Sequence, residues 1–257
     1  MQCPICRQIL KKDKDDFNNT IYICDNKHSF DVSKYGYVNL SNKSNSGDNK
    51  EMVKNRHFFL NKNYYLKLAL RLKEIVKELK VNNILDIGCG EGYFDRVIKD
   101  DNINITGLDI SKDAVLCAAK SDKTINYVVA SAFKIPFIDN YFDLILSIFA
   151  PIDCNEASRV CDNYLIKVIP NKNHLIELKH ELYDNVYENN ILKENIDHFD
   201  LIKEECIEYH SFVDDVNELF KMTPYYYSTH NNFEIELESM DITFSFIIRL
   251  YKRHISW

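Results

Sequence analysis

The sequence has 257 residues, 46% of them hydrophobic and 28% charged, with a formal net charge of −7 at pH 7. This composition allows one large domain, or one ordinary domain with a small additional module. The negative charge argues against a protein that coats nucleic acid without specificity, but it leaves recognition of a folded RNA open. No stretch reaches the roughly 18–20 uncharged apolar residues of a membrane span, and no apolar signal core follows Met1, so we expect a cytoplasmic protein without a membrane partner.

Four metal-ligating side chains stand within the first 40 residues. Two residues separate Cys3 from Cys6, and three separate Cys24 from His28. In a reducing compartment thiols stay free or bind metal. Two such pairs can close a tetrahedron around zinc, which replaces the core that a short segment cannot build. We expect a structural zinc module at residues 1–40, because the alternative, buried thiols with a surface histidine, explains the paired spacing less well.

The remaining chain predicts a helical segment followed by an α/β domain. Residues 42–50 form a polar run typical of a linker, and helical periodicity follows up to Lys80, so we assign 41–80 to a linker and helical segment. From 81 to 257, alternating strands and helices indicate a doubly wound parallel sheet, with a late antiparallel strand at Asp241–Tyr251. Residues 181–235 carry no chemical signature. The other strands are expected at Ile84–Ile87, Ile105–Ile110, Tyr127–Ala130, Phe142–Ile148 and Tyr164–Ile169, and helices at Tyr93–Lys99 and Asp113–Lys120.

A glycine-rich turn follows the first of these strands, where Asp86 precedes Gly88, Gly90 and Gly92. Glycine lets the backbone turn sharply and approach an extended ligand, and the helix that follows offers free N–H groups. Asp109 ends the next strand, where a carboxylate can accept both ribose hydroxyls. These features predict a Rossmann-like nucleotide-cofactor site.

The spacing of the glycines separates two cofactors that share this architecture. Dinucleotide domains carry Gly-x-Gly-x-x-Gly, whereas this chain has Gly-x-Gly-x-Gly with an acid two residues earlier. That pattern resembles the class I methyltransferase loop, as does the segment Ile135–Asp143, and Ser131 stands where that family contacts adenine. We therefore expect S-adenosylmethionine; a dinucleotide domain and a fold that has lost its cofactor remain the alternatives.

The segment after the fourth strand narrows the methyl acceptor by exclusion. Enzymes that methylate exocyclic amines of bases usually carry Asn/Asp-Pro-Pro-Tyr/Phe there, and cytosine C5 enzymes need a thiolate, often in Pro-Cys. This chain reads Phe149-Ala150-Pro151-Ile152, with Cys154 two residues further on. Neither chemistry is expected.

The order of features along nearly the whole chain resembles the RlmA-type bacterial 23S ribosomal RNA guanine-N1 methyltransferases. The combination of the zinc ligands with Gly-Tyr-Val-Asn-Leu is specific. One departure is Cys161–Tyr164, which stands where family members usually have a Pro-Gly-Gly turn. The matching motifs are Cys-Pro-x-Cys at 3–6, Cys-x3-His at 24–28, Tyr35–Leu40, Gly47-Asp48, Leu85–Tyr93, Ala150-Pro151, His174-Leu175 and Met222–Pro224.

The resemblance implies a substrate and a set of site residues. It implies methylation of guanine N1 in the hairpin 35 region, a domain II hairpin of 23S rRNA, by a homodimer that grips the RNA with its zinc module and its methyltransferase domain. It also implies that Cys3, Cys6, Cys24 and His28 hold zinc, and that Tyr65, Gly90, Glu91 and His174 belong to the cofactor site. From the residues alone, Tyr65 could equally be an aromatic that packs in the core, and His174 would be interpreted as a surface histidine at the end of a strand.

The catalytic residues remain open. The proton on guanine N1 must pass to a carboxylate, a histidine or water, for which His174 and Glu91 are conceivable acceptors. Phe149 and Tyr225–Tyr227 are candidate platforms for the unstacked base. Two other hypotheses stand beside the rRNA enzyme: a small-molecule methyltransferase, and a noncatalytic RNA-binding protein that retains the fold.

Overall fold

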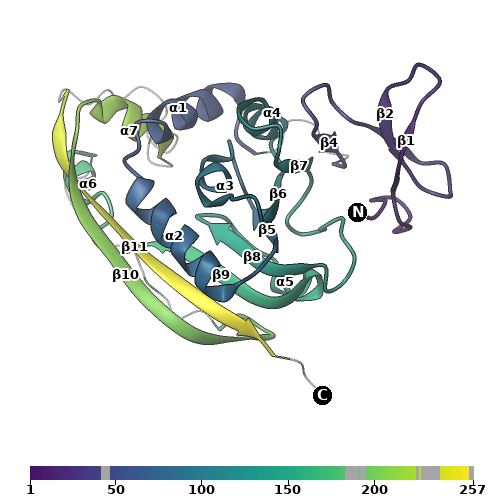
Figure 1. The fold of residues 1–257 in the computed structure, drawn as a ribbon. Helices are drawn as coiled ribbons and strands as arrows, with labels where there is room; N and C mark the ends of the chain where they lie inside the picture. Colours follow the sequence, from purple (N-terminus) through teal and green to yellow (C-terminus); the bar gives the residue numbers. More distant parts are fainter. Residues whose placement is uncertain (42–46, 183–190, 192–194, 224–225, 227–237, 255–257) are drawn as a thin grey trace.

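The computed structural model describes residues 1–41, 47–182, 191, 195–223, 226 and 238–254. Its main feature is an eight-stranded sheet in the order β10-β11-β9-β8-β5-β6-β7-β4 (Figure 1). All neighbouring strands from β9 to β4 are parallel. At the other edge, β11 pairs antiparallel with both β9 and β10. This confirms the doubly wound class I fold. The strands are β4 (Val38–Asn39), β5 (Asn83–Ile87), β6 (Asn104–Asp109), β7 (Asn126–Val129), β8 (Phe142–Ile148), β9 (Cys161–Pro170), β10 (Phe199–Val213) and β11 (Met240–Arg253).

The helices contribute to two buried clusters. One cluster combines the sheet with apolar side chains of α1, α2, α3, α4, α6 and α7, such as Leu68 of α2, which is fully buried. The second cluster contains Val160 of α5 together with residues of the zinc module, including Cys3 and Leu10. The helices are α1 (Lys50–Leu60), α2 (Leu66–Leu79), α3 (Tyr93–Ile98), α4 (Lys112–Ser121), α5 (Cys154–Val160), α6 (Ile176–Leu182) and α7 (Val216–Met222).

Side-chain caps fix where several helices begin. The side chain of Asn49 accepts the N–H groups of Glu51 and Met52, so α1 starts inside the polar run that the sequence assigned to a linker. Ser111 caps α4 in the same way through the N–H of Ala114. The first part of the linker, residues 42–46, lies outside the described residues.

The zinc module is a three-stranded antiparallel sheet that projects from the α/β body (Figure 1). Its strands are β1 (Lys11–Lys14), β2 (Thr20–Ile23) and β3 (Ser29–Asp31). The chain then enters β4, which pairs in parallel with β7 and so extends the central sheet. The N–H of Gln2 also donates to the carbonyl of Pro136 at 2.8 Å. The module is therefore fixed to the α/β body near both of its ends, to a loop through Gln2 and to the central sheet through β4.

The C-terminal strand was predicted from the sequence, whereas the strand that pairs with it at the sheet edge was not. β11 covers Asp241–Tyr251 and pairs antiparallel with β9. β10, an edge strand of 15 residues, lies in the stretch that carried no signature. Its burial alternates only from Glu205 to Val213, and the covered face there includes the polar residues Glu205 and Ser211, so no hydrophobic alternation marks the whole strand in the sequence. Within the described residues, no helix is long and apolar enough to cross a membrane.

Candidate cofactor site and zinc centre

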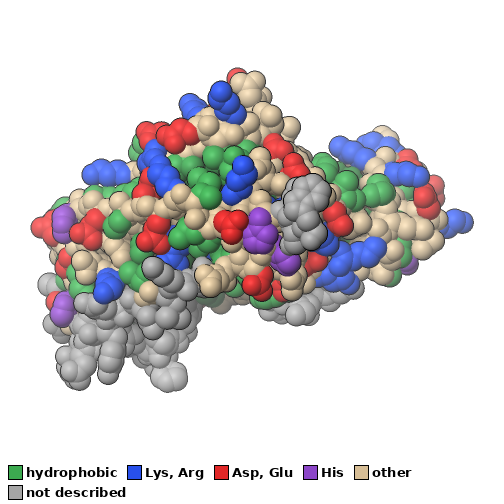
Figure 2. All heavy atoms as spheres, turned by 90° about the horizontal axis from the view of Figure 1, so that it is seen from below, with side chains coloured by type: hydrophobic (Ala, Val, Ile, Leu, Met, Phe, Trp, Pro, Cys, Tyr) green, Lys and Arg blue, Asp and Glu red, His purple; other side chains and the backbone are tan. Residues whose placement is uncertain are grey.

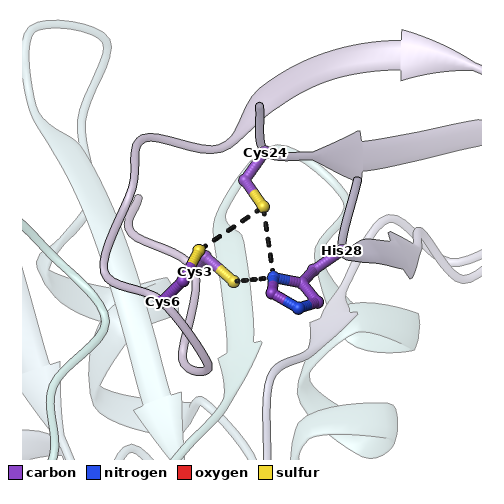
Figure 3. A group of neighbouring side chains, drawn as sticks. All are labelled: Cys3, Cys6, Cys24 and His28. Carbon is purple, nitrogen blue, oxygen red and sulfur yellow. Dashed lines mark hydrogen bonds between the residues drawn. The ribbon is translucent and has the colours of Figure 1, made fainter. Parts of the chain in front are cut away.

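Four predicted metal ligands meet in the zinc module (Figure 3). The Sγ atoms of Cys3 and Cys24 lie 3.6 and 3.4 Å from Nδ1 of His28, and Sγ of Cys6 lies 3.6 Å from Sγ of Cys24. A zinc tetrahedron with Zn–S near 2.3 Å and Zn–N near 2.0 Å has edges of roughly 3.5–3.8 Å. Three thiolates and one imidazole at these separations fit a structural zinc ion with no open position.

Two backbone turns aim these ligands. The N–H of Arg7 donates to the carbonyl of Cys3, and the N–H of Lys27 donates to the carbonyl of Cys24, both at 2.8 Å. Arg7 and Lys27 both have φ of +61°, which closes each turn tightly behind its cysteine. The two halves of the centre therefore have similar local structure.

The glycine-rich turn lies at the carboxyl end of β5. The N–H groups of Gly88 and Cys89 both donate to the carbonyl of Leu108 on β6, which ties the turn to the neighbouring strand. Gly88 and Gly90 have φ of +76° and +57°, values that side-chain-bearing residues rarely adopt. A Cβ added to Gly88 would lie 2.4 Å from Cβ of Ala150, whereas a Cβ added to Gly90 would lie in open space.

A cavity of about 520 Å³ opens over this turn. Its size lies in the range of small-molecule and cofactor sites. Of the predicted cofactor residues, six line it and three, namely Gly92, Asp109 and Ser131, do not. Lining residues from the prediction are Tyr65, Asp86, Gly88, Gly90, Glu91 and His174; the others include Arg56, Phe94, Phe149, Lys167 and Thr223.

Asp109 is nevertheless joined to the glycine turn. Its carboxylate accepts the N–H of Gly90 at 3.0 Å and the N–H of Ser111 at 2.7 Å. Burial raises the pKa of Asp109, and these two backbone hydrogen bonds oppose the rise. A carboxylate has room for further donors, so Asp109 can accept ribose hydroxyls at the end of β6. Ser131 follows β7, where its hydroxyl accepts the N–H of Phe133 at 3.2 Å.

Tyr65 and His174, far apart in the sequence, meet in the cavity wall. Tyr65 Oη lies 3.4 Å from Nε2 of His174, and both side chains are buried. The N–H of Ser245 donates to Nδ1 of His174 at 3.3 Å, so the proton of the neutral ring is on Nε2. Burial, the larger effect, and the charge of Lys179 lower the pKa of His174 to about 3. His174 is therefore neutral at physiological pH, with its acceptor nitrogen occupied.

The carboxylate of Glu91 is held by two neighbours. Arg96 donates to its two oxygens at 3.2 and 2.9 Å, and Nδ1 of His57 lies 2.5 Å from Oε2. Cys117 brings a third metal-ligating atom close to His57 and Glu91. Because Arg96 already compensates the charge of Glu91, this second cluster is explained as an ion-pair network linking α1, the glycine turn and α3.

Phe149, a predicted base platform, lines the cavity, whereas Asp95 carried no sequence signal beyond its type. Phe149 has φ of +57° and is 41% exposed at the cavity, with its ring 13° from parallel to His174 and the centroids 6.5 Å apart. Bulky residues rarely adopt this backbone region, and such strain clusters at functional sites. Asp95 is fully buried beneath the glycine turn. Of the other suggested base platforms, Tyr225 and Tyr227 lie outside the described residues, and Tyr226 packs on Phe220.

Comparison with known proteins identifies the two modules. Residues 1–41 match the family described as RlmA, N-terminal, and residues 85–165 match the family described as Methyltransferase domain. The chain is 33% identical over 196 residues to a Bacillus subtilis (strain 168) protein provisionally named 23S rRNA (guanine-N(1)-)-methyltransferase YxjB, covering 71% of this chain and 68% of that protein. The chain belongs to the RlmA-type 23S rRNA guanine-N1 methyltransferase family.

Further comparisons agree. A 23S rRNA (guanine(748)-N(1))-methyltransferase of Streptomyces fradiae is 29% identical over 189 residues, with coverage of 69% of this chain and 66% of that protein. The solved PH0226 protein of Pyrococcus horikoshii OT3 has a TM-score of 0.50 at 18% identity, covering 76% of this chain and 91% of its own, and supports the fold alone. The protein is a methyltransferase with S-adenosylmethionine as cofactor and a structural zinc ion.

Proposed function

We propose that this protein methylates N1 of a guanine in the hairpin 35 region of domain II of 23S rRNA. The observation that carries the proposal is the joint presence of both modules: relatives named as 23S rRNA guanine-N1 methyltransferases align with about two-thirds or more of the chain. The zinc module is attached to the sheet that bears the cavity, so one RNA can contact both. Acidic and basic side chains are interspersed on the face shown in Figure 2, which favours recognition of one RNA shape over nonspecific coating.

The cofactor would lie across the glycine turn. Gly88, Gly90 and Gly92 allow its close approach, Asp109 accepts the ribose hydroxyls, and Ser131 lies near the adenine. Tyr65, Asp86, Glu91 and His174 complete the wall; Glu91 acts through its backbone, because Arg96 and His57 hold its carboxylate. The bound cofactor supplies an electrophilic methyl group, and the protein chiefly positions the acceptor in line with it, a contribution worth up to roughly 7–11 kcal/mol.

Phe149 is the residue that we assign to the flipped guanine. It lies next to Ala150, which contacts the glycine turn, and its ring is exposed in the cavity. An aromatic face there can stack on an unpaired base close to the methyl donor. The N1 proton would pass to water, because the acceptor nitrogen of His174 is bonded to Ser245 and Glu91 is paired with Arg96.

The two remaining hypotheses explain less of the structure. A small-molecule methyltransferase has no need of a zinc module fixed to its sheet. A noncatalytic RNA-binding protein would not need an open cavity of about 520 Å³ over an intact glycine turn. We further propose that the protein acts in the cytoplasm, where its ribosomal substrate is assembled, and that it works as a homodimer.

Incorporation of labelled methyl groups tests this function. Zinc-loaded protein would be incubated with methyl-labelled S-adenosylmethionine and a transcript of 23S rRNA domain II, and the digested RNA would be analysed for 1-methylguanosine. We expect one labelled 1-methylguanosine per transcript, and none when the guanines of the hairpin 35 region are replaced by adenines. Label in another nucleoside, or label that persists after this replacement, would contradict the proposal.

A further inference from the structure

Three buried polar side chains gather on Gly107, beside the glycine turn. Asp86 on β5, Gly107 on β6 and Tyr127 on β7 are paired residues in adjacent strands, so their side-chain positions lie in one row. Asp95 reaches the same place from α3. A Cβ on Gly107 would lie 2.6 Å from the Tyr127 ring and 2.9 Å from Oδ2 of Asp95. The missing side chain of Gly107 therefore provides the space that Asp95 and Tyr127 occupy.

The hydrogen bonding of this cluster is incomplete without an added proton. Asp86 is 2% exposed and Asp95 is fully buried. Within the described chain, Oδ1 of Asp86, both carboxylate oxygens of Asp95 and the hydroxyl of Tyr127 have no hydrogen bond of ordinary geometry. Ionised carboxylates only accept hydrogen bonds, so two of them in contact cannot satisfy each other. A proton on one carboxyl supplies the missing donor.

Burial and the acidic neighbours of the pair also favour an added proton. Burial, followed by repulsion from Asp95, raises the pKa of Asp86 well above its usual range, and burial raises the pKa of Asp95 to about 7. Arg96 opposes the rise at Asp95, but its guanidinium is bonded to Glu91. The other titratable groups that act on the pair, from the glycine turn, β6 and β7, are Cys89, Glu91, Asp109 and Tyr127.

Only one member of the pair reaches the cavity. Asp86 lines the cavity, whereas Asp95 lies behind it and does not. We propose that Asp95 is a positioning residue of the cofactor site, which shares a proton with Asp86 and so sets the charge that Asp86 presents to S-adenosylmethionine. The inference rests on the cofactor lying over the glycine turn. Because the cofactor carries an ammonium and a sulfonium group, its binding favours two ionised carboxylates, and the shared proton leaves to solvent.

Calorimetry on the full-length, zinc-loaded protein tests this coupling. S-adenosylmethionine would be titrated at pH 6, 7 and 8 in buffers of different ionisation enthalpy, which reports protons released on binding. For the wild type we expect proton release near pH 7 and a Kd that rises by up to tenfold per pH unit on acidification below the pKa of the pair. In Asp95→Asn, an amide donates to Asp86 in place of the shared proton, so the release is lost and the Kd stays nearly constant with pH.

Controls separate this inference from the cofactor site itself. Asp113→Asn removes an exposed carboxylate on α4 and should behave as the wild type. The amine of the cofactor titrates equally in every experiment. The difference in proton release between the wild type and Asp95→Asn therefore reports the Asp86–Asp95 pair alone. Wild-type binding without proton release, or the same pH dependence in Asp95→Asn, would overturn the role of Asp95 alone. Absence of binding to the wild type would overturn the cofactor site as well. The wild-type measurements stand without the variant should Asp95→Asn fold poorly.

Discussion

Alanine substitutions in the glycine turn should separate its role in folding from its role in binding. Both Gly88 and Gly90 have positive φ, which costs an alanine about 1–2 kcal/mol. At Gly88 the new Cβ would also meet Cβ of Ala150 at 2.4 Å, an overlap that adds about 1–3 kcal/mol. We expect Gly88→Ala to lower the free energy of unfolding by about 2–5 kcal/mol, and Gly90→Ala by only about 1–2 kcal/mol.

Affinity for the cofactor should follow a different order. A Cβ on Gly90 meets no protein atom within 4 Å and projects beside the cavity, into the space that we assign to S-adenosylmethionine. Gly90→Ala should therefore weaken binding at least about tenfold, or 1.4 kcal/mol, in a protein that remains folded. Gly36→Ala is the matched control, since Gly36 has φ of +95°, an open surrounding and no place in the cavity.

Urea unfolding and calorimetric titration of the three variants provide the measurement. Gly36→Ala should show the backbone cost with unchanged cofactor affinity. Two results would refute the reasoning: a Gly88→Ala protein as stable as Gly36→Ala, or a Gly90→Ala protein that binds S-adenosylmethionine as the wild type does. The first would deny the close approach to Ala150, and the second would deny that the cofactor lies over the turn.

Three further predictions concern the zinc ion, the base platform and the buried acids. Cys24→Ser should reduce zinc measured by plasma mass spectrometry to well under one ion per chain and increase hydrogen exchange in residues 1–40; full zinc retention would contradict the ligand assignment. Phe149→Ala should lower kcat/KM for RNA roughly 5- to 150-fold, from about 1–3 kcal/mol of stacking, with the Kd for S-adenosylmethionine unchanged; normal RNA turnover would remove Phe149 from the site. Because the folded pKa of Asp95 is about 7 against an ordinary 3.8, the folded protein binds more protons between these values. Its unfolding free energy should therefore fall as the pH rises from about 4 to 7, by up to about 1.4 kcal/mol per pH unit, and level off above pH 7. Urea titrations without cofactor measure this fall, which should be smaller in Asp95→Asn. An equal pH dependence of the unfolding free energy in both proteins would exclude the shared proton.

The sequence predicted the parts of the site that depend on local spacing. Cys3, Cys6, Cys24 and His28 each lie on a short turn whose geometry follows from neighbouring residues, so the ligand pairs could be found without the fold. Gly88 could be found for the same reason, because a tight turn after a buried strand demands glycine.

The remaining parts of the site depend on contacts between distant segments, which local spacing cannot show; Tyr65 and His174 were expected only from the family resemblance, and Asp95 and β10 were not expected at all. Tyr65 meets His174 only after β11 supplies the N–H of Ser245, which also fixes the histidine tautomer. Asp95 resembles any other polar residue of a short helix, and its full burial arises from Gly107 on a neighbouring strand. β10 was missed because its first half is exposed at the sheet edge, and the covered face of its second half mixes Glu205 and Ser211 with apolar residues.

The most direct test of the account is nucleoside mass spectrometry of the hairpin 35 region of 23S rRNA, isolated from cells with and without the gene. We predict 1-methylguanosine in that hairpin in the parent strain, its loss on deletion, and its return when the wild-type gene is supplied but not when Gly90→Ala is supplied. An unchanged level of 1-methylguanosine in the deletion strain would contradict the central claim.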